Sequence, residues 1–360
     1  MDVPGARKAY YPQSDFANPR PGASGGELGW QFTFDGDEMG DRPMKRILVT
    51  GSVGQIGSEL VMELRKRVGN DNVLGTFHRT LPTDELTESG PMEKIRIQDP
   101  DDIARLVEEY DIDTVFNMAA ILSAVGEQKP QLCWDVNMNG FINILEVARA
   151  KELRQVINPS SIAAFGPETP LLNTPNDTIL KPKTMYGVTK VAGEILGDYY
   201  FHKYGLDVRG MRLPGIVSWK TPPGGGTTDY SVAIYYEAVQ HRRYTCFVKE
   251  DTRLPLMYMP DCLNSMIDLA EAPLKNLIHH CDFNVTAFSN SPAEIAESIK
   301  GHYPDFEATY EPDFRQAIAD SWPDSIDDSV ARAEWGWDPK YDLEKMTVDM
   351  LENLEKKLLG

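Results

Sequence analysis

The chain has 360 residues, of which 41% are hydrophobic and 25% charged, and its formal net charge is −19 at pH 7. This charge repels phosphate backbones and anionic lipid, so we expect neither nucleic acid nor a membrane surface as a partner. No apolar run reaches the roughly 18 residues that a transmembrane helix requires.

Residues 1–43 are rich in Gly and Pro and show no periodic hydrophobic pattern. We therefore expect a disordered or draped extension over this segment. Its acidic residues outnumber its basic ones, which disfavours a mitochondrial presequence, and it lacks the apolar core of a secretory signal.

From residue 44 the hydrophobic pattern predicts alternating strands and helices. Short apolar runs indicate strands at residues 46–50, 72–77, 114–116, 155–157 and 208–213. Apolar residues recur at helical spacing around residues 60–68, 103–110, 141–148 and 343–358, and a further helix is expected over residues 185–204. Such alternation predicts an α/β fold with a doubly wound parallel sheet of the Rossmann kind.

A glycine-rich motif lies between the first strand and the first helix, and it reads Thr50-Gly51-Ser52-Val53-Gly54-Gln55-Ile56-Gly57. Gly51 permits a tight turn, Gly54 lets the backbone approach a pyrophosphate, and Gly57 lets helix and strand pack closely. A glycine turn that serves only packing is the alternative. The motif predicts a cofactor-binding Rossmann domain over residues 44–220. The regular alternation of strands and helices ends after Thr221, which predicts a smaller substrate-binding lobe over residues 221–360.

The residue at the end of the second strand determines whether the site prefers NAD or NADP. A carboxylate at this position would accept the ribose hydroxyls and repel a 2′-phosphate. The chain instead reads Phe77-His78-Arg79. His78 and Arg79 either contact a phosphate or are solvated loop residues, and both alternatives remain open.

Three side chains further along suggest acid–base chemistry. Tyr186 and Lys190 are four residues apart on a predicted helix and therefore share one face. A nearby ammonium and an oxidised nicotinamide would lower the phenol pKa from its usual value near 10. Ser161 follows a strand, where its hydroxyl can reach a substrate oxygen. Each feature taken alone is common by chance, and a Ser-Ser turn is usually only a turn.

Together these motifs resemble the short-chain dehydrogenase/reductase superfamily in its extended, epimerase/dehydratase-like form, from about Lys45 to the end of the chain. Further matches are Asn117-Met118-Ala119-Ala120, Asn137 and Arg212-Leu213-Pro214-Gly215-Ile216. Within the superfamily the chain looks like the zinc-independent L-threonine 3-dehydrogenases. The segments that carry this likeness are residues 120–127, 161–166, 213–216, 224–230, 257–261 and 321–325.

The resemblance implies oxidation of the 3-hydroxyl of L-threonine by NAD, giving 2-amino-3-ketobutyrate and NADH. It implies that Ser161 orients the substrate hydroxyl, that Tyr186 is the general base, and that Lys190 lowers the pKa of Tyr186 and holds the ribose. Ser123 and Thr227 match positions that bind the amino acid. The implied cofactor site comprises Gly51, Gly54, Gln55, Ile56, Gly57, His78, Arg79, Asp99, Ala119, Ala120, Asn137, Tyr186, Lys190 and Ile216.

The chain departs from the family pattern on the adenosine side of that site. The usual Asp is absent at residues 77–79, and the usual adenine-side acid is displaced near residues 96–99. We therefore expect NAD as the working cofactor, with NADP discriminated less than about a hundredfold because the repulsive carboxylate is missing.

Two other functions remain open, namely an epimerase or dehydratase acting on a nucleotide sugar and a non-catalytic dinucleotide-binding module. The first would require a pocket for a second nucleotide. The second has no use for the trio of Ser161, Tyr186 and Lys190.

The cysteines indicate a reducing compartment and no metal site. Cys133, Cys246, Cys262 and Cys281 form no CxxC pair and lack zinc-ligand spacing to histidine. We expect free thiols, a cytoplasmic location or alternatively the mitochondrial matrix, and no bound metal. The resemblance further implies a homodimer formed through the helices at residues 140–150 and 185–204.

Overall fold

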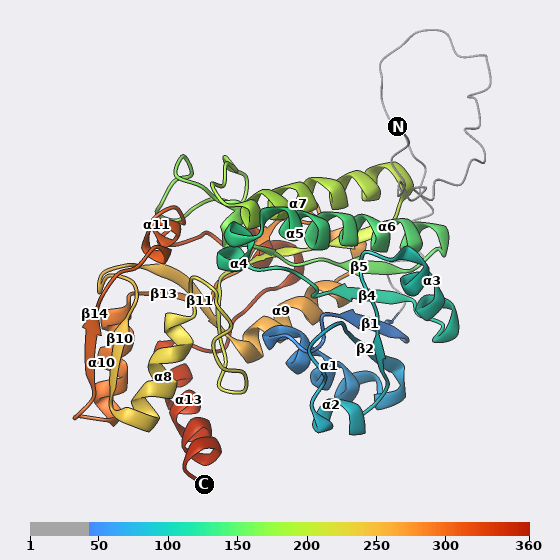
Figure 1. Ribbon diagram of the computed structural model, residues 1–360. Helices are drawn as coiled ribbons and strands as arrows, with labels where there is room; N and C mark the ends of the chain where they lie inside the picture. The colour runs from blue at the N-terminus through green and yellow to red at the C-terminus, as the bar shows by residue number, and fades with distance from the viewer. Residues whose placement is uncertain (1–42) are drawn as a thin grey trace, which may run out of the picture. The chain divides into compact units, whose positions relative to one another are not determined.

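The computed structural model describes residues 43–360, so the prediction for residues 1–43 concerns a segment that lies, Pro43 apart, outside the described residues. A six-stranded parallel sheet in the order β3-β2-β1-β4-β5-β7 forms its centre (Figure 1). These strands are β1 (Ile47–Thr50), β2 (Val73–Phe77), β3 (Met92–Lys94), β4 (Thr114–Asn117), β5 (Gln155–Ile157) and β7 (Asp207–Arg209). The predicted doubly wound α/β fold is confirmed.

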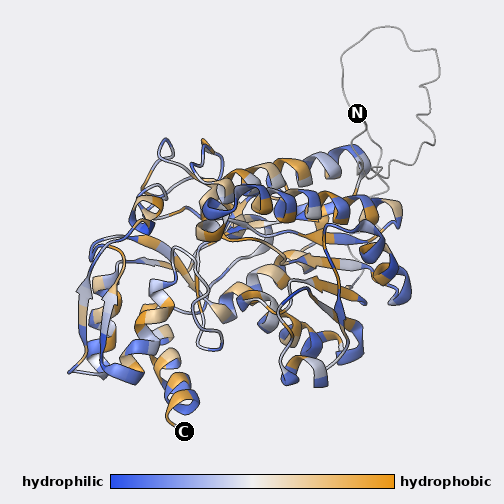
Figure 2. Ribbon diagram, in the orientation of Figure 1, coloured by the Kyte–Doolittle hydropathy of each residue, from blue (hydrophilic) through white to orange (hydrophobic). Residues whose placement is uncertain are grey.

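Both faces of this sheet are buried, as the continuous apolar runs predict. In β1, Ile47 and Val49 belong to one hydrophobic core and Leu48 to the other, because successive side chains of a strand point to opposite faces. Figure 2 shows the central strands in hydrophobic colours.

Helices cover the two faces of the sheet. The helices are α1 (Gln55–Val68), α2 (Asp84–Glu88), α3 (Pro100–Glu109), α4 (Ser123–Gln128), α5 (Pro130–Trp134), α6 (Gly140–Ala150), α7 (Met185–Tyr204), α8 (Tyr230–His241), α9 (Met259–Glu271), α10 (Pro292–His302), α11 (Arg315–Ala319), α12 (Ser329–Trp335) and α13 (Leu343–Leu358). Helices α1 and α9 cover one face, and α3, α6 and α7 cover the other (Figure 1). Their buried side chains belong to the two hydrophobic cores on either side of the sheet. No helix within residues 43–360 is long and apolar enough to cross a bilayer.

The strand predicted over residues 208–213 is wrong in one respect, because the chain changes sheets at Gly210. Before it, β7 pairs with β5 in the central sheet. After it, β8 (Met211–Leu213) joins β6 (Ser160–Ser161) and β12 (Phe283–Asn284) in a separate three-stranded sheet. The Gly210 amide donates to the carbonyl of His280 at 2.8 Å. A continuous apolar run cannot reveal such a change of partner, since both halves are equally buried.

The remaining strands extend the C-terminal part of the chain. They are β9 (Gly215–Val217), β10 (Arg243–Cys246), β11 (Leu254–Tyr258), β13 (Phe288–Asn290) and β14 (Glu307–Tyr310). Helices α8, α10 and α13 pack around a core that also includes Tyr186 at the start of α7. The predicted boundary near residue 220, between the Rossmann domain and the substrate-binding lobe, stays a prediction. Helix α9 follows that boundary in the chain but packs against α1, which precedes it.

Candidate active site

The glycine motif forms the turn between β1 and α1 and has the form that a pyrophosphate site requires. Gly51 has φ +62°, and a Cβ there would lie 2.7 Å from the amide nitrogen of Ala119. A Cβ on Gly57 would lie 2.3 Å from the carbonyl oxygen of Gly51. Only glycine fits at these two positions.

The N-terminus of α1 is free to receive an anion. Its N-cap residue, Gly54, makes no side-chain capping bond, and the first turn carries no acidic residue. By contrast, α3 and α7 are capped by Asp99 and Thr184. The unused amides and the helix dipole of α1 favour a phosphate group, so the residues present fit the dinucleotide that the motif implies.

A chain of side-chain hydrogen bonds joins the carboxyl ends of the central strands. Thr50 Oγ1 donates to Asn117 Oδ1 at 2.8 Å and accepts from the Ala119 amide at 3.2 Å. Asn117 Nδ2 donates to Asn158 Oδ1 at 2.8 Å. These bonds place Ala119 and the adjoining Ala120 beside the glycine loop. Sequence reasoning gave no role to Asn158, although a polar residue at a strand end was the available signal.

Tyr186, Lys190 and Ser161 are brought together at the start of α7. The Lys190 Nζ lies 5.4 Å from the centre of the Tyr186 ring and donates to the Pro159 carbonyl at 2.6 Å. The Ser161 hydroxyl accepts a hydrogen bond from the Ala163 amide at 3.2 Å. It also forms a hydrogen bond with the Tyr186 phenol that lowers the pKa of that phenol. All three functional groups therefore meet at one end of the sheet.

Burial has the largest effect on the pKa values of Tyr186 and Lys190 in the chain by itself, and the lowering of the Tyr186 pKa by Lys190 and an oxidised nicotinamide stays a prediction. Burial raises the pKa of Tyr186 to about 12, although a hydrogen bond with Ser161 opposes the rise. Burial likewise lowers the pKa of Lys190 to about 8, and nearby Glu194 opposes this shift. Desolvation is the largest contribution to the pKa shift of each of the two groups.

Asn137 lies in a π-helical turn, Asp135–Asn139, between α5 and α6. Its Oδ1 accepts from the Ile121 amide at 2.8 Å, and its Nδ2 donates to the Ile121 carbonyl at 3.1 Å and to Thr189 Oγ1 at 3.0 Å. Asn137 thus holds the segment after β4 against α7. The contact of Asn137 with the cofactor, which the resemblance implies, stays a prediction.

The two residues expected to bind the amino acid meet each other. The hydroxyls of Ser123 and Thr227 are 3.2 Å apart, and both residues are buried. They are distant in the sequence, so this contact attaches the 224–230 segment to the first turn of α4. Gln55 Nε2, on α1, donates to the carbonyl of Ile216 at 3.5 Å. Ile56 lies partly buried against the core below the glycine loop.

The remaining cofactor candidates lie at the ends of β2 and β3. His78 and Arg79 follow β2 and are exposed. Asp99 is exposed and caps α3, with its side chain accepting a hydrogen bond from the Asp101 amide at 3.2 Å.

A buried ion pair lies behind the catalytic candidates. Arg212 Nη2 contacts Glu194 Oε2 at 2.9 Å, and the pair is almost fully buried. Glu194 also accepts a hydrogen bond from Ser160, the neighbour of Ser161. Glu194 follows Lys190 by one helical turn, and that spacing was the signal that could have revealed it.

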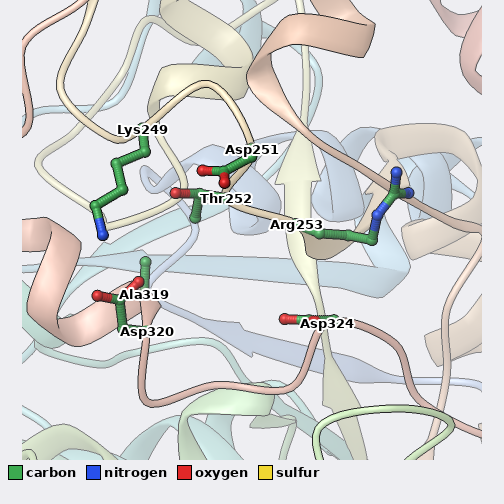
Figure 3. Close-up of a pocket in the computed structure, with 7 residues that line it drawn as sticks. All are labelled: Lys249, Asp251, Thr252, Arg253, Ala319, Asp320 and Asp324. Carbon is green, nitrogen blue, oxygen red and sulfur yellow. The ribbon is translucent and has the colours of Figure 1, made fainter.

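A pocket of about 230 Å³ is lined by other residues than these (Figure 3). Its charged lining consists of Lys249, Asp251, Arg253, Asp320 and Asp324. Arg253 is already paired with Glu294, and none of the predicted site residues lines the pocket. Within residues 43–360 no group of three or more His, Cys, Asp or Glu side chains is placed to hold a metal ion.

Comparisons with known proteins agree with this geometry. Residues 47–285 match the NAD dependent epimerase/dehydratase family. An uncharacterized epimerase/dehydratase of Staphylococcus saprophyticus is 50% identical over 87% of this chain and 98% of its own length. The L-threonine dehydrogenase structure from Clostridium difficile is 51% identical, covers 89% of this chain and 100% of its own, and has a TM-score of 0.87. A monomeric L-threonine 3-dehydrogenase from a metagenome is 46% identical over 86% of this chain and 99% of its own, with a TM-score of 0.83.

Proposed function

The chain belongs to the NAD dependent epimerase/dehydratase family, and from this premise we propose that it oxidises the 3-hydroxyl of L-threonine to 2-amino-3-ketobutyrate. The observation that carries the proposal is the buried contact between Ser123 and Thr227. The segments that hold these two residues are among those in which the sequence resembles L-threonine 3-dehydrogenases. The 51% identity to the Clostridium difficile L-threonine dehydrogenase confirms that resemblance.

NAD is the cofactor that we propose. Gly51, Gly54 and Gly57, with the free N-terminus of α1, would hold the pyrophosphate, and Lys190 would hold the nicotinamide ribose. When bound, the nicotinamide ring supplies the hydride acceptor.

The chain's own residues bind and orient the substrate. Ser123 and Thr227 offer hydroxyls that can donate to a carboxylate and accept from an ammonium group. Ser161 donates to the substrate 3-hydroxyl, which places that hydroxyl beside the phenol. Proximity and alignment of this kind are the protein's main contribution to the rate.

Tyr186 accepts the proton of the 3-hydroxyl at its phenolic oxygen. In the chain by itself the pKa of Tyr186 is about 12, so the phenol is protonated at neutral pH. The phenolate therefore forms more readily as the pH rises or as positive charge enters the pocket. Lys190, whose pKa is about 8, holds part of that charge beside the ring.

We further propose a homodimer formed through α5, α6 and α7. Apolar side chains lie exposed on these helices, namely Leu132, Trp134, Ile142, Val188, Ile195 and Tyr199. On α7, Val188, Ile195 and Tyr199 recur at helical spacing and so form one face. An apolar face of this kind is typical of a protein interface.

The test of the function is the production of reduced cofactor from L-threonine, followed by absorbance. L-threonine with NAD should give steady reduction, and UDP-glucose should give none. Turnover of UDP-glucose without L-threonine oxidation would instead support the nucleotide-sugar alternative. Cofactor binding without turnover of either compound would support the non-catalytic alternative.

A further inference from the structure

The carboxyl end of β2 lies directly beside the glycine loop. The amide and the hydroxyl of Ser52 both donate to the carbonyl of Thr76, at 3.0 and 2.8 Å. The residues that follow Thr76 therefore lie where the adenosine ribose of a bound dinucleotide belongs, at the end of the second strand. Phe77, the first of them, is half-buried and can neither accept the ribose hydroxyls nor repel a phosphate.

The neighbouring strand brings further positive charge to the same edge. β3 runs parallel to β2, with Phe77 opposite Lys94, and the Ile95 amide donates to the Phe77 carbonyl at 2.9 Å. The two strands therefore end together. The side chains that they present here, all exposed, are His78, Arg79, Lys94 and Arg96, which we call the β2–β3 cationic group.

Members of this group act on one another electrostatically. The pKa of His78 is lowered, first by partial burial and then by the charges of Arg79, Arg96 and Lys94. The positive charges are thus close enough to disfavour a further proton on the imidazole. In a chain with a net charge of −19, a cluster of positive charges at one edge of the sheet is typical of a site that binds an anion.

No carboxylate within residues 43–360 forms an ion pair with this group, and none of its side chains forms a hydrogen bond there. The acids that follow β3 are engaged by main-chain amides. Asp99 accepts from the Asp101 amide, and Asp102 accepts from the Arg96 amide at 3.2 Å. The guanidinium and ammonium groups themselves remain available to a ligand.

We propose that the β2–β3 cationic group binds the 2′-phosphate of a phosphorylated nicotinamide dinucleotide, so that this chain binds NADP more tightly than NAD, against the preference for NAD expected from the sequence. The inference rests on the proposed function only in placing the dinucleotide at the glycine loop. Guanidinium forks match phosphate geometry and form charge-assisted hydrogen bonds with it. The missing carboxylate at residue 77 removes the repulsion that would otherwise exclude that phosphate.

Binding of adenosine fragments tests this inference without any turnover. Isothermal titration calorimetry would compare adenosine 2′,5′-bisphosphate with adenosine 5′-monophosphate on the full chain. We expect the bisphosphate to bind about tenfold more tightly, since a hydrogen bond to a charged group is worth at least about that factor. Raising the salt concentration should reduce this preference, because the group is exposed.

Three variants and one control complete the test. Arg79→Ala and Arg96→Ala should each reduce the preference several-fold, and Phe77→Asp should abolish it by restoring repulsion. Arg105→Ala is the matched control, because Arg105 is exposed on the nearby α3 and already pairs with Glu109 at 2.7 Å. It should leave the preference unchanged.

Equal binding of the two fragments would overturn the inference, as would a preference that survives both arginine variants. The proposed function is judged separately, by reduction of NAD with L-threonine. If L-threonine is oxidised but the fragments bind equally, only the 2′-phosphate site is wrong. If the fragments differ as expected and L-threonine is not oxidised, the 2′-phosphate site is supported and the proposed function is wrong.

Discussion

Burial shifts the pKa values of Tyr186 and Lys190 in opposite directions. It disfavours the charged form of each, and therefore raises the pKa of Tyr186 to about 12 and lowers that of Lys190 to about 8. At neutral pH the phenol is consequently neutral and the amine is mostly protonated. The rate of proton removal should therefore rise with pH over the range in which Tyr186 becomes ionised.

Tyr186→Phe removes the phenol and keeps the ring, so we expect kcat for L-threonine oxidation to fall about a hundredfold or more. The rising limb of the pH–rate profile should be lost with it, while NAD binding by calorimetry changes little. Tyr199→Phe, on an exposed part of the same helix, is the control. Near-normal turnover in Tyr186→Phe would remove this residue from the mechanism.

Thr227→Ala tests the contact with the amino acid. The loss of one hydrogen bond to a charged group is worth about ten- to a hundredfold. We therefore expect KM for L-threonine to rise by about that factor while Kd for NAD is unchanged. Thr227→Ser keeps the hydroxyl and should restore most of the loss. An equal weakening of both ligands would mean that Thr227 does not face the substrate.

At the scale of elements, the proposed catalytic side chains of α7 lie on one face of the helix. Tyr186, Lys190 and Glu194 are spaced by four residues, and Glu194 anchors the stripe to Arg212 on β8. Arg212 also donates to the Asn176 carbonyl at 2.7 Å. The ion pair thus ties the helix to the small sheet that contains Ser161, and it positions the hydroxyl relative to the phenol.

Arg212→Met should lower the free energy of unfolding by about 3–5 kcal/mol, because it leaves the carboxylate of Glu194 buried without its partner. Denaturation in urea measures this change. The double variant Arg212→Met with Glu194→Leu should recover part of the stability, since no buried charge is then unpaired. Lys66→Met breaks an exposed pair with Glu63 and should cost less than about 1 kcal/mol. A single variant as stable as the parent would contradict the assigned role.

At the scale of the whole molecule, the apolar side chains exposed on α5, α6 and α7 form the surface through which we propose that a partner binds. Ile195 is 65% exposed and lies on one face of α7 with Val188 and Tyr199, which are also exposed, and a group of this kind is typical of a surface that a partner covers. A second copy of the chain is the occupant that we propose. One related L-threonine 3-dehydrogenase is monomeric, so the assembly must be measured on this chain.

Ile195→Glu should convert the dimer to a monomer, because it places a charge on the apolar face of α7. Light scattering coupled to gel filtration gives the mass. Ile278→Glu is the control, since Ile278 is 82% exposed and lies outside these helices. A parent protein that is monomeric at all concentrations would make the dimer prediction wrong.

Local features of the sequence were sufficient to predict the central part of the fold. The helix expected at residues 185–204 is α7. The expected strands at β1, β2, β4 and β5 each carry a buried apolar run bounded by polar residues. The short helices α4 and α5 were not predicted, since each is too short to establish a period.

The sequence by itself determined the dinucleotide fold and the glycine turn, because each depends on residue types at short, fixed spacing. It also pointed to Ser161, Tyr186 and Lys190 as a catalytic trio, and their catalytic roles stay predictions. Only the tertiary structure decided which distant groups meet. Ser123 contacts Thr227, Glu194 pairs with Arg212, and the strand expected at residues 208–213 divides between two sheets. Burial likewise decided the protonation of Tyr186 and Lys190, because desolvation depends on what surrounds a side chain in space and not on its neighbours in the sequence.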